Sequence, residues 1–258
     1  MKAIWLSALN KDEAAVQKVM GQFKAYGIEL QGHFWQNDNA KMGWLAPKDE
    51  LLKPDIAMWA ILGSRQELEN NDLRYGLSLL ALTVQAQKGI GFPMVILQTE
   101  GDPVTAAELP DPLRRALVLP AGNAATPAKL VAKVHAKAPD LPVAYHLDMV
   151  GNEQLGQWLQ VYPAGDTWPG IIFGVDAGEI LFQAVGPPGK LPQKATLNYA
   201  MQGLKLEMGG TEFTAWATQN EVCAESAYFI KISGTPGTLV FGPFAEDAEA
   251  EFYVVHLQ

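Results

Sequence analysis

The chain has 258 residues, 48% of them hydrophobic and 18% charged, which is enough for two domains that each bury a core. Its longest apolar runs fall far short of the roughly 20 residues of a membrane span, so we expect no membrane partner. The opening residues are typical of a first strand rather than a signal peptide, and a cytoplasmic location follows. A single cysteine, Cys223, excludes an internal disulfide and a multi-cysteine metal site, and we expect no bound metal.

The net charge of −9 is distributed unevenly along the chain. Residues 1–140 contain 15 basic and 15 acidic side chains, so residues 141–258 carry the whole net charge. The change coincides with the proline-rich sequence KAPDLP at residues 137–142, which predicts an α/β domain over residues 1–138 and an acidic β-rich domain over residues 143–258. An acidic second half excludes nucleic acid as a partner, because binding to phosphates needs a basic surface.

Apolar strand-like runs alternate with helical patterns through the first part of the chain. In chain order the expected strands are residues 2–7, 28–36, 55–62, 92–98 and 114–120. The expected helices are residues 8–27, 46–53, 67–89 and 126–138. This alternation predicts a doubly wound, five-stranded parallel sheet with helices on both faces, in the flavodoxin-like order 2-1-3-4-5.

The second part consists of short runs rich in β-branched and aromatic residues, separated by Gly/Pro turn signals. The expected strand regions are residues 143–149, 155–163, 170–185, 195–208, 211–218, 227–233, 237–242 and 251–258. No helical pattern of useful length interrupts them. The pattern predicts an antiparallel β-sandwich or barrel.

Polar side chains follow the strands that flank the point where the expected strand order reverses, which is where open parallel sheets bind ligands. The candidate ligand-binding residues there are Ser7, Asn10, Asp38, Ser64 and Arg65. Arg65 could pair with a phosphate or a carboxylate through two parallel hydrogen bonds. The alternative is that Ser64 caps the following helix and Arg65 is a solvated surface charge.

About residues 1–135 resemble a TIR domain, and two segments carry the likeness. IWLSALNKDEAAVQKVMGQFKAYGIEL matches the first strand, helix and second strand of that family, and PDIAMWAILGSRQELENNDLRYGL resembles its third strand and the start of the next helix. The family pattern has a serine at the strand end, then a serine, a tryptophan and a catalytic glutamate six, eight and twelve residues on. Counted from Ser64, this chain has Asn70, Asp72 and Gly76. The resemblance therefore implies a flavodoxin-like domain without the glutamate of NAD-cleaving members.

The sequence leaves three functions open. The first is a non-catalytic, TIR-like binding module that associates with a protein partner or with itself and needs no cofactor. The second is a nucleotide-processing enzyme of the NAD glycohydrolase kind, in which Asp72 or Asp38 supplies the carboxylate and a nucleotide is the ligand. The third is a structural component of a larger assembly.

Overall fold

The computed structural model describes residues 2–244 and 251–258 of the chain. Its contacts divide the chain into two units, one formed by Met1–Asn39 with Gly43–Leu141 and the other by Ala40–Met42 with Pro142–Gln258. Helices occur in the first unit, whereas the described part of the second is built from strands and turns. The α/β plus all-β fold class is therefore confirmed.

Five parallel strands form the sheet of the first unit, and their order is β2-β1-β3-β4-β5, as the sequence predicts. The strands are β1 (Ala3–Ala8), β2 (Glu29–Phe34), β3 (Ile56–Gly63), β4 (Met94–Gln98) and β5 (Leu117–Pro120). Every residue of β1 and β4 is buried, as expected of strands covered on both faces.

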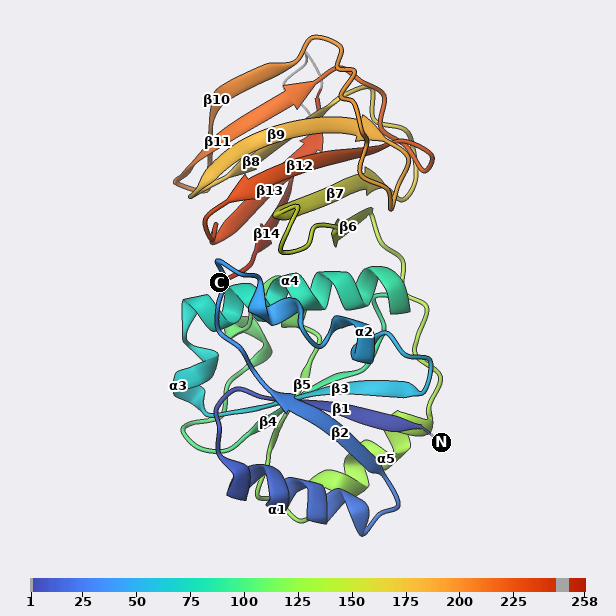
Figure 1. Ribbon diagram of the computed structural model, residues 1–258, viewed down its shortest axis with the longest axis vertical. Coiled ribbons are helices and arrows are strands. Elements are labelled where there is room, and N and C mark those ends of the chain that lie inside the picture. Colours follow the sequence, from blue (N-terminus) through green and yellow to red (C-terminus); the bar gives the residue numbers. More distant parts are fainter. Residues whose placement is uncertain (1, 245–250) are drawn as a thin grey trace. The chain divides into compact units, whose positions relative to one another are not determined.

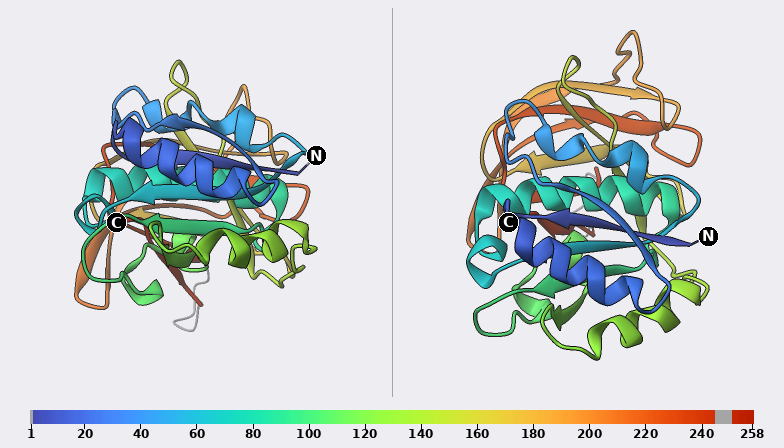
Figure 2. Two further views of the ribbon diagram at one scale, coloured as in Figure 1. Left: turned by 90° about the horizontal axis from the view of Figure 1, so that it is seen from below. Right: turned by 60° about the horizontal axis from the view of Figure 1, so that its bottom comes forward.

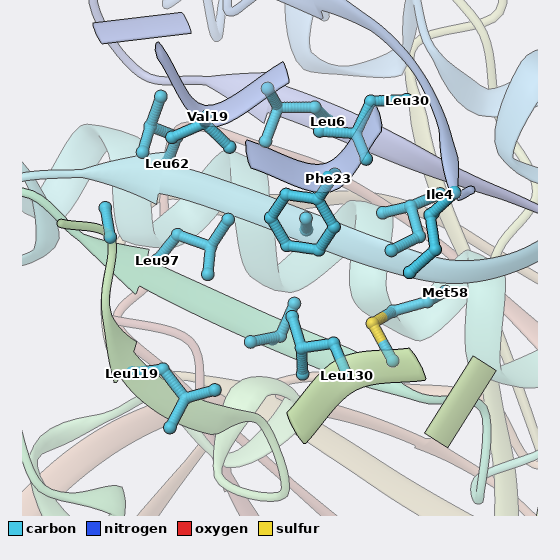
Figure 3. Close-up of a cluster of buried hydrophobic side chains, with 14 of the residues drawn as sticks. Ile4, Leu6, Val19, Phe23, Leu30, Met58, Leu62, Leu97, Leu119 and Leu130 are labelled. Carbon is cyan, nitrogen blue, oxygen red and sulfur yellow. The ribbon is translucent and has the colours of Figure 1, made fainter. Parts of the chain in front are cut away.

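Helices cover both faces of this sheet. Figures 1 and 2 show α1 (Glu13–Lys24) and α5 (Thr126–His135) on one face and α4 (Asn71–Lys88) on the other, with α2 (Lys48–Leu51) beside α4. Phe23 of α1 and Leu130 of α5 pack onto the side chains of β1, β3 and β4 in the buried cluster of Figure 3. Three short 3-10 helices, Gly43–Leu45, Ala106–Glu108 and Asp111–Leu113, lie in the connections.

One helix predicted from the sequence is two helices in the structure. Residues 67–89 have a continuous helical pattern, but a four-residue helix, α3 (Arg65–Leu68), ends before α4 begins at Asn71. The Asn70 side chain accepts a hydrogen bond from the Leu73 backbone N–H at 3.1 Å and so caps α4. The Asn70 side-chain oxygen takes the place of a backbone carbonyl as acceptor for the Leu73 N–H. One helix therefore ends before Asn70 and a new one begins after it.

The second unit is a β-sandwich of two antiparallel sheets. One sheet has the order β6-β7-β12-β9 and the other β10-β11-β8-β13-β14. The bounds are β6 (Tyr145–Met149), β7 (Gln157–Pro163), β8 (Ile171–Val175), β9 (Glu179–Gly186), β10 (Met201–Met208), β11 (Thr211–Thr218), β12 (Ala227–Ser233), β13 (Thr238–Pro243) and β14 (Tyr253–His256). The rings of Phe173 on β8 and Tyr228 on β12 approach to 6.4 Å between centroids, so the two sheets pack face to face.

No helix in the described ranges combines the length and the apolar character needed to cross a membrane.

Candidate functional site

Ser7 lies in the interior of the first unit rather than at its surface. It is fully buried on β1, and its hydroxyl accepts a hydrogen bond of 2.9 Å from the indole N–H of Trp59 on the neighbouring strand β3. The bond satisfies a buried indole donor that would otherwise cost free energy. The hydroxyl therefore cross-links two central strands, and ligand binding by Ser7 stays a prediction.

Ser64 begins α3 with a reciprocal pair of hydrogen bonds. The Glu67 backbone N–H donates to the Ser64 hydroxyl at 3.2 Å, and the Glu67 carboxylate accepts from the Ser64 backbone N–H at 2.7 Å. This is a capping box, in which each residue satisfies a donor that the helix start leaves free. These bonds support the alternative that Ser64 caps the following helix.

The Arg65 guanidinium is held by two carboxylates of the same unit. Its Nε lies 2.7 Å from Glu69, one turn along the chain, and its Nη2 lies 2.5 Å from Glu108. The hydrogen bond to Glu108 is the main cause that raises the pKa of Arg65. Arg65 therefore links α3 to the 3-10 helix Ala106–Glu108 at the surface of the unit, and a ligand would have to compete with both carboxylates.

Glu108 is the anionic end of this link. The backbone N–H and hydroxyl of Thr105 donate to its carboxylate at 2.8 Å each. These bonds, followed by the one from Arg65, lower the pKa of Glu108 to about 2. The carboxylate is thus ionised at neutral pH and engaged on both oxygens.

Two of the remaining candidates, Asn10 and Asp38, lie in loops, and the third, Asp72, lies in α4. The exposed Asn10 accepts a hydrogen bond of 3.1 Å from the Asp12 backbone N–H, next to the Asp12 cap of α1. Asp38 is half-buried in the connection after β2, and Asp72 is exposed in the first turn of α4. The Asn39 side chain donates to the Asp72 carbonyl at 3.1 Å, so the structure brings the segments of these two aspartates together.

Gly76 occupies the place where the resemblance expects the catalytic glutamate. It is buried on α4, and a Cβ there would lie 3.0 Å from the Trp44 Cβ and 3.2 Å from the Trp35 Cζ2. Two buried indoles therefore fill the space that a glutamate side chain would need.

Sequence reasoning missed this aromatic cluster, which contains Trp5, His33, Trp35 and Trp44. The Trp5 indole donates to His33 Nδ1 at 3.2 Å, and the His33 and Trp35 rings lie 6.1 Å apart. Within the described residues, His33 Nε2 and the indole nitrogens of Trp35 and Trp44 are buried without a hydrogen-bond partner. Their wide spacing in the sequence hides the cluster, although three tryptophans within the first 44 residues could have drawn attention to it.

The described residues contain no group of three or more His, Cys, Asp or Glu side chains that could hold a metal ion.

A second candidate surface lies on the four-stranded sheet of the β-sandwich. On the adjacent strands β9, β12 and β7 (Figure 1), Phe182 is opposite Lys231, and Lys231 is opposite Trp158. The Trp158 and Phe182 rings lie 5.8 Å apart, and the Trp158 indole donates to the Leu155 carbonyl at 3.1 Å. We call the apolar side chains Leu155, Trp158, Leu181 and Phe182 the β9 patch.

The β9 patch is open to solvent, and Lys231 and Glu179 lie beside it. Leu155, Leu181 and Phe182 are each 46–47% exposed, which is unusual for three large apolar side chains in one region. Leu181 lies where the β9–β12 register shifts, beside the edge of the sheet. Glu179 is opposite Ser233, which lies two residues from Lys231 on β12. Side chains two residues apart on a strand project from the same face, so Glu179 and Lys231 share a face of the sheet.

Comparisons with known proteins do not assign the chain to a family. No family model and no curated protein matches it. Among solved structures, a two-domain esterase (CEX) active on acetylated mannans is similar at 9% identity and a TM-score of 0.34, over 99% of this chain and 90% of that chain. The same esterase co-crystallised with mannopentaose gives 10% identity and a TM-score of 0.30, over 99% and 89%. Scores this low carry no argument about fold or function.

Proposed function

We propose that the chain is a non-catalytic binding protein that associates with a second copy of itself through the β9 patch. The observation that carries this proposal is the exposure of Leu181 and Phe182 on β9 and of Leu155 in the turn before β7, whose carbonyl accepts a hydrogen bond from Trp158. Contiguous exposed apolar surface is rare on soluble monomers and marks interaction sites, because burying it releases water.

The charges beside the patch favour a second copy as the partner. A two-fold interface brings the same surface of both copies together, so each contact occurs twice. Lys231 of one copy can then meet Glu179 of the other, and the reverse, so the surface is complementary to itself. Elsewhere the net charge of −9 makes copies repel, and association should strengthen as salt screens that repulsion.

The polar groups of the first unit also support binding over catalysis. Ser7, Ser64 and Arg65 are each engaged in bonds that hold the fold, to Trp59, to Glu67 and to Glu69 with Glu108. We propose that the unit is TIR-like in the restricted sense of strand order and residue pattern. Tryptophan side chains occupy the space beside Gly76 that a glutamate at this position would need.

Sedimentation velocity over a concentration series tests the proposal. Wild type should form a dimer as concentration rises, and Phe182→Ser should remain monomeric under the same conditions. Tyr199→Ser is the matched control, because Tyr199 is also an exposed aromatic residue, at 79%, but lies outside the patch. A wild-type chain that stays monomeric throughout, or a Phe182→Ser chain that dimerises equally well, would refute the proposal.

A further inference from the structure

A cavity of about 260 Å³ opens at the amino-terminal ends of β4 and β5, away from the strand ends discussed above. Its wall is formed by the turn that precedes β4, by Arg115 before β5, and by the end of α5 with the segment that follows it. A Cβ at Gly91 would lie 2.0 Å from the Pro139 carbonyl oxygen, so the two backbone segments touch at the wall. Close backbone packing gives the cavity a defined shape.

Three cationic side chains line this cavity and no acidic one does. They are Arg115 before β5, Lys133 in the last turn of α5, and Lys137 just beyond that helix. In the described part of the chain none of the three forms an ion pair, whereas the adjacent Arg114 pairs with Asp111 at 2.6 Å. All three residues are exposed to solvent, and cations that line one cavity favour the binding of an anion there.

The end of α5 does not account for all three charges. A lysine in the last turn of a helix offsets the partial negative charge of the terminal carbonyls, which explains Lys133. The carbonyl of Val134 already accepts a hydrogen bond of 3.0 Å from the Lys2 ammonium. Lys137 follows the helix and Arg115 comes from a different segment, so their convergence needs another explanation.

The deeper wall of the cavity is apolar. Phe92 and Met94 are buried there, and Ile90, Pro93 and Leu141 add further hydrocarbon surface. Lys88, whose ammonium lies 4.9 Å from the Phe92 ring centroid, helps to fix that ring. Ligand sites commonly combine such apolar walls with a few convergent polar groups.

We propose that this cavity binds a small organic anion in which a phosphate or carboxylate group is attached to an apolar body. Arg115, Lys133 and Lys137 would bind the anionic group at the opening, and the side chains around Met94 would contact the apolar body. The cavity lies just below the roughly 300–1000 Å³ of sites for drug-sized ligands, so the ligand is smaller than those. This site is independent of the proposed self-association.

The methyl group of Met94 allows binding to be observed at the cavity itself. The chain has eight methionines, so ¹³C-methyl labelling gives a short spectrum in which the other signals serve as internal controls. The signal is assigned with Met94→Leu, and phenyl phosphate is titrated at constant ionic strength. The Met94 signal should shift saturably with phenyl phosphate, and much less with inorganic phosphate or with phenol.

Two variants test the charges and the space separately. Arg115→Gln with Lys137→Gln should weaken phenyl phosphate binding roughly 10- to 100-fold, as expected for losing charged hydrogen bonds. Arg114→Gln, the neighbouring arginine outside the cavity, should bind like wild type. Ala136→Phe fills the cavity from an exposed position without changing its charge and should abolish the shift.

The proposal fails if the Met94 signal does not move in wild type. It fails equally if the double glutamine variant or Ala136→Phe binds as well as wild type. Equal affinity for inorganic phosphate and phenyl phosphate would overturn the apolar part of the assignment.

Discussion

Gly76 of α4 lies against Trp44, so close that a Cβ at Gly76 would be 3.0 Å from the Trp44 Cβ. Adding a side chain there forces buried rings to move, which costs about 1–3 kcal/mol and outweighs the gain in helix propensity of about 1 kcal/mol. We therefore expect Gly76→Ala to lower the free energy of unfolding, measured by urea denaturation. Gly21→Ala is the control, because that α1 position has open space and should gain stability.

The same contact bears on nucleotide cleavage. Gly76→Glu restores the residue type of NAD-cleaving TIR domains but places a carboxylate among buried indoles, and it should destabilise the chain by at least about 2 kcal/mol. We expect neither wild type nor this variant to release nicotinamide from NAD, measured by chromatography. Release by wild type that Asp72→Ala abolishes would establish the nucleotide-processing alternative instead.

The capping box of α3 predicts a modest effect at Ser64. Ser64→Ala removes the hydroxyl that accepts from the Glu67 backbone N–H, and it should lower the free energy of unfolding by about 1 kcal/mol. Ser64→Thr keeps the hydroxyl and should retain most of the stability. Urea denaturation of the two variants measures the difference, and equal losses in both would show that packing rather than capping governs this position.

The ion pair between Arg65 and Glu108 should make stability depend on pH in the acid range. Because the folded pKa of Glu108 is lowered to about 2, its stabilisation is complete above the unfolded value near 4.3 and is lost as pH falls toward 2. Glu108→Gln should therefore melt at a lower temperature than wild type at pH 7, and the difference should shrink between pH 4 and pH 2. Melting followed by circular dichroism measures this, and a constant difference would contradict this role of the ion pair.

His33 is cationic when protonated, unlike Glu108, and should make stability depend on pH in a different range. Burial lowers the pKa of His33 to about 4, so between about pH 6.5 and pH 4 the unfolded chain binds a proton that the folded chain does not. Stability should fall across that window by roughly 1–2 kcal/mol, a value reduced for partial exposure of the ring. His33→Gln should show a flatter profile by urea denaturation at pH 7 and pH 4.5. An equal fall in the free energy of unfolding in wild type and His33→Gln would show that other groups cause the loss of stability in acid.

Hydrophobic pattern was sufficient to predict the fold class. Strand β3 is apolar at nearly every position, and this pattern identified a strand buried on both faces. The pattern did not reveal the break between α3 and α4, because the Asn70 cap depends on one local hydrogen bond within an otherwise helical sequence.

Side-chain contacts between distant segments were beyond sequence reasoning. Arg65 was weighed as a ligand contact or a solvated charge, whereas Glu108, 43 residues further on, holds it in place. The β9 patch depends on strand pairing that brings Phe182 and Trp158 to opposite sides of Lys231. Neither arrangement follows from spacing along the chain, since both depend on which loops and strands become neighbours after folding.

Exchange of the two charges beside the β9 patch tests self-association through this surface. Glu179→Lys and Lys231→Glu each place like charges together in a two-fold interface, and each alone should weaken dimerisation measured by sedimentation velocity at low salt. The double variant restores opposite charges across the interface, and we expect it to dimerise nearly as well as wild type. A double variant as weak as the sum of the two single changes, or single variants that dimerise like wild type, would contradict self-association through this surface.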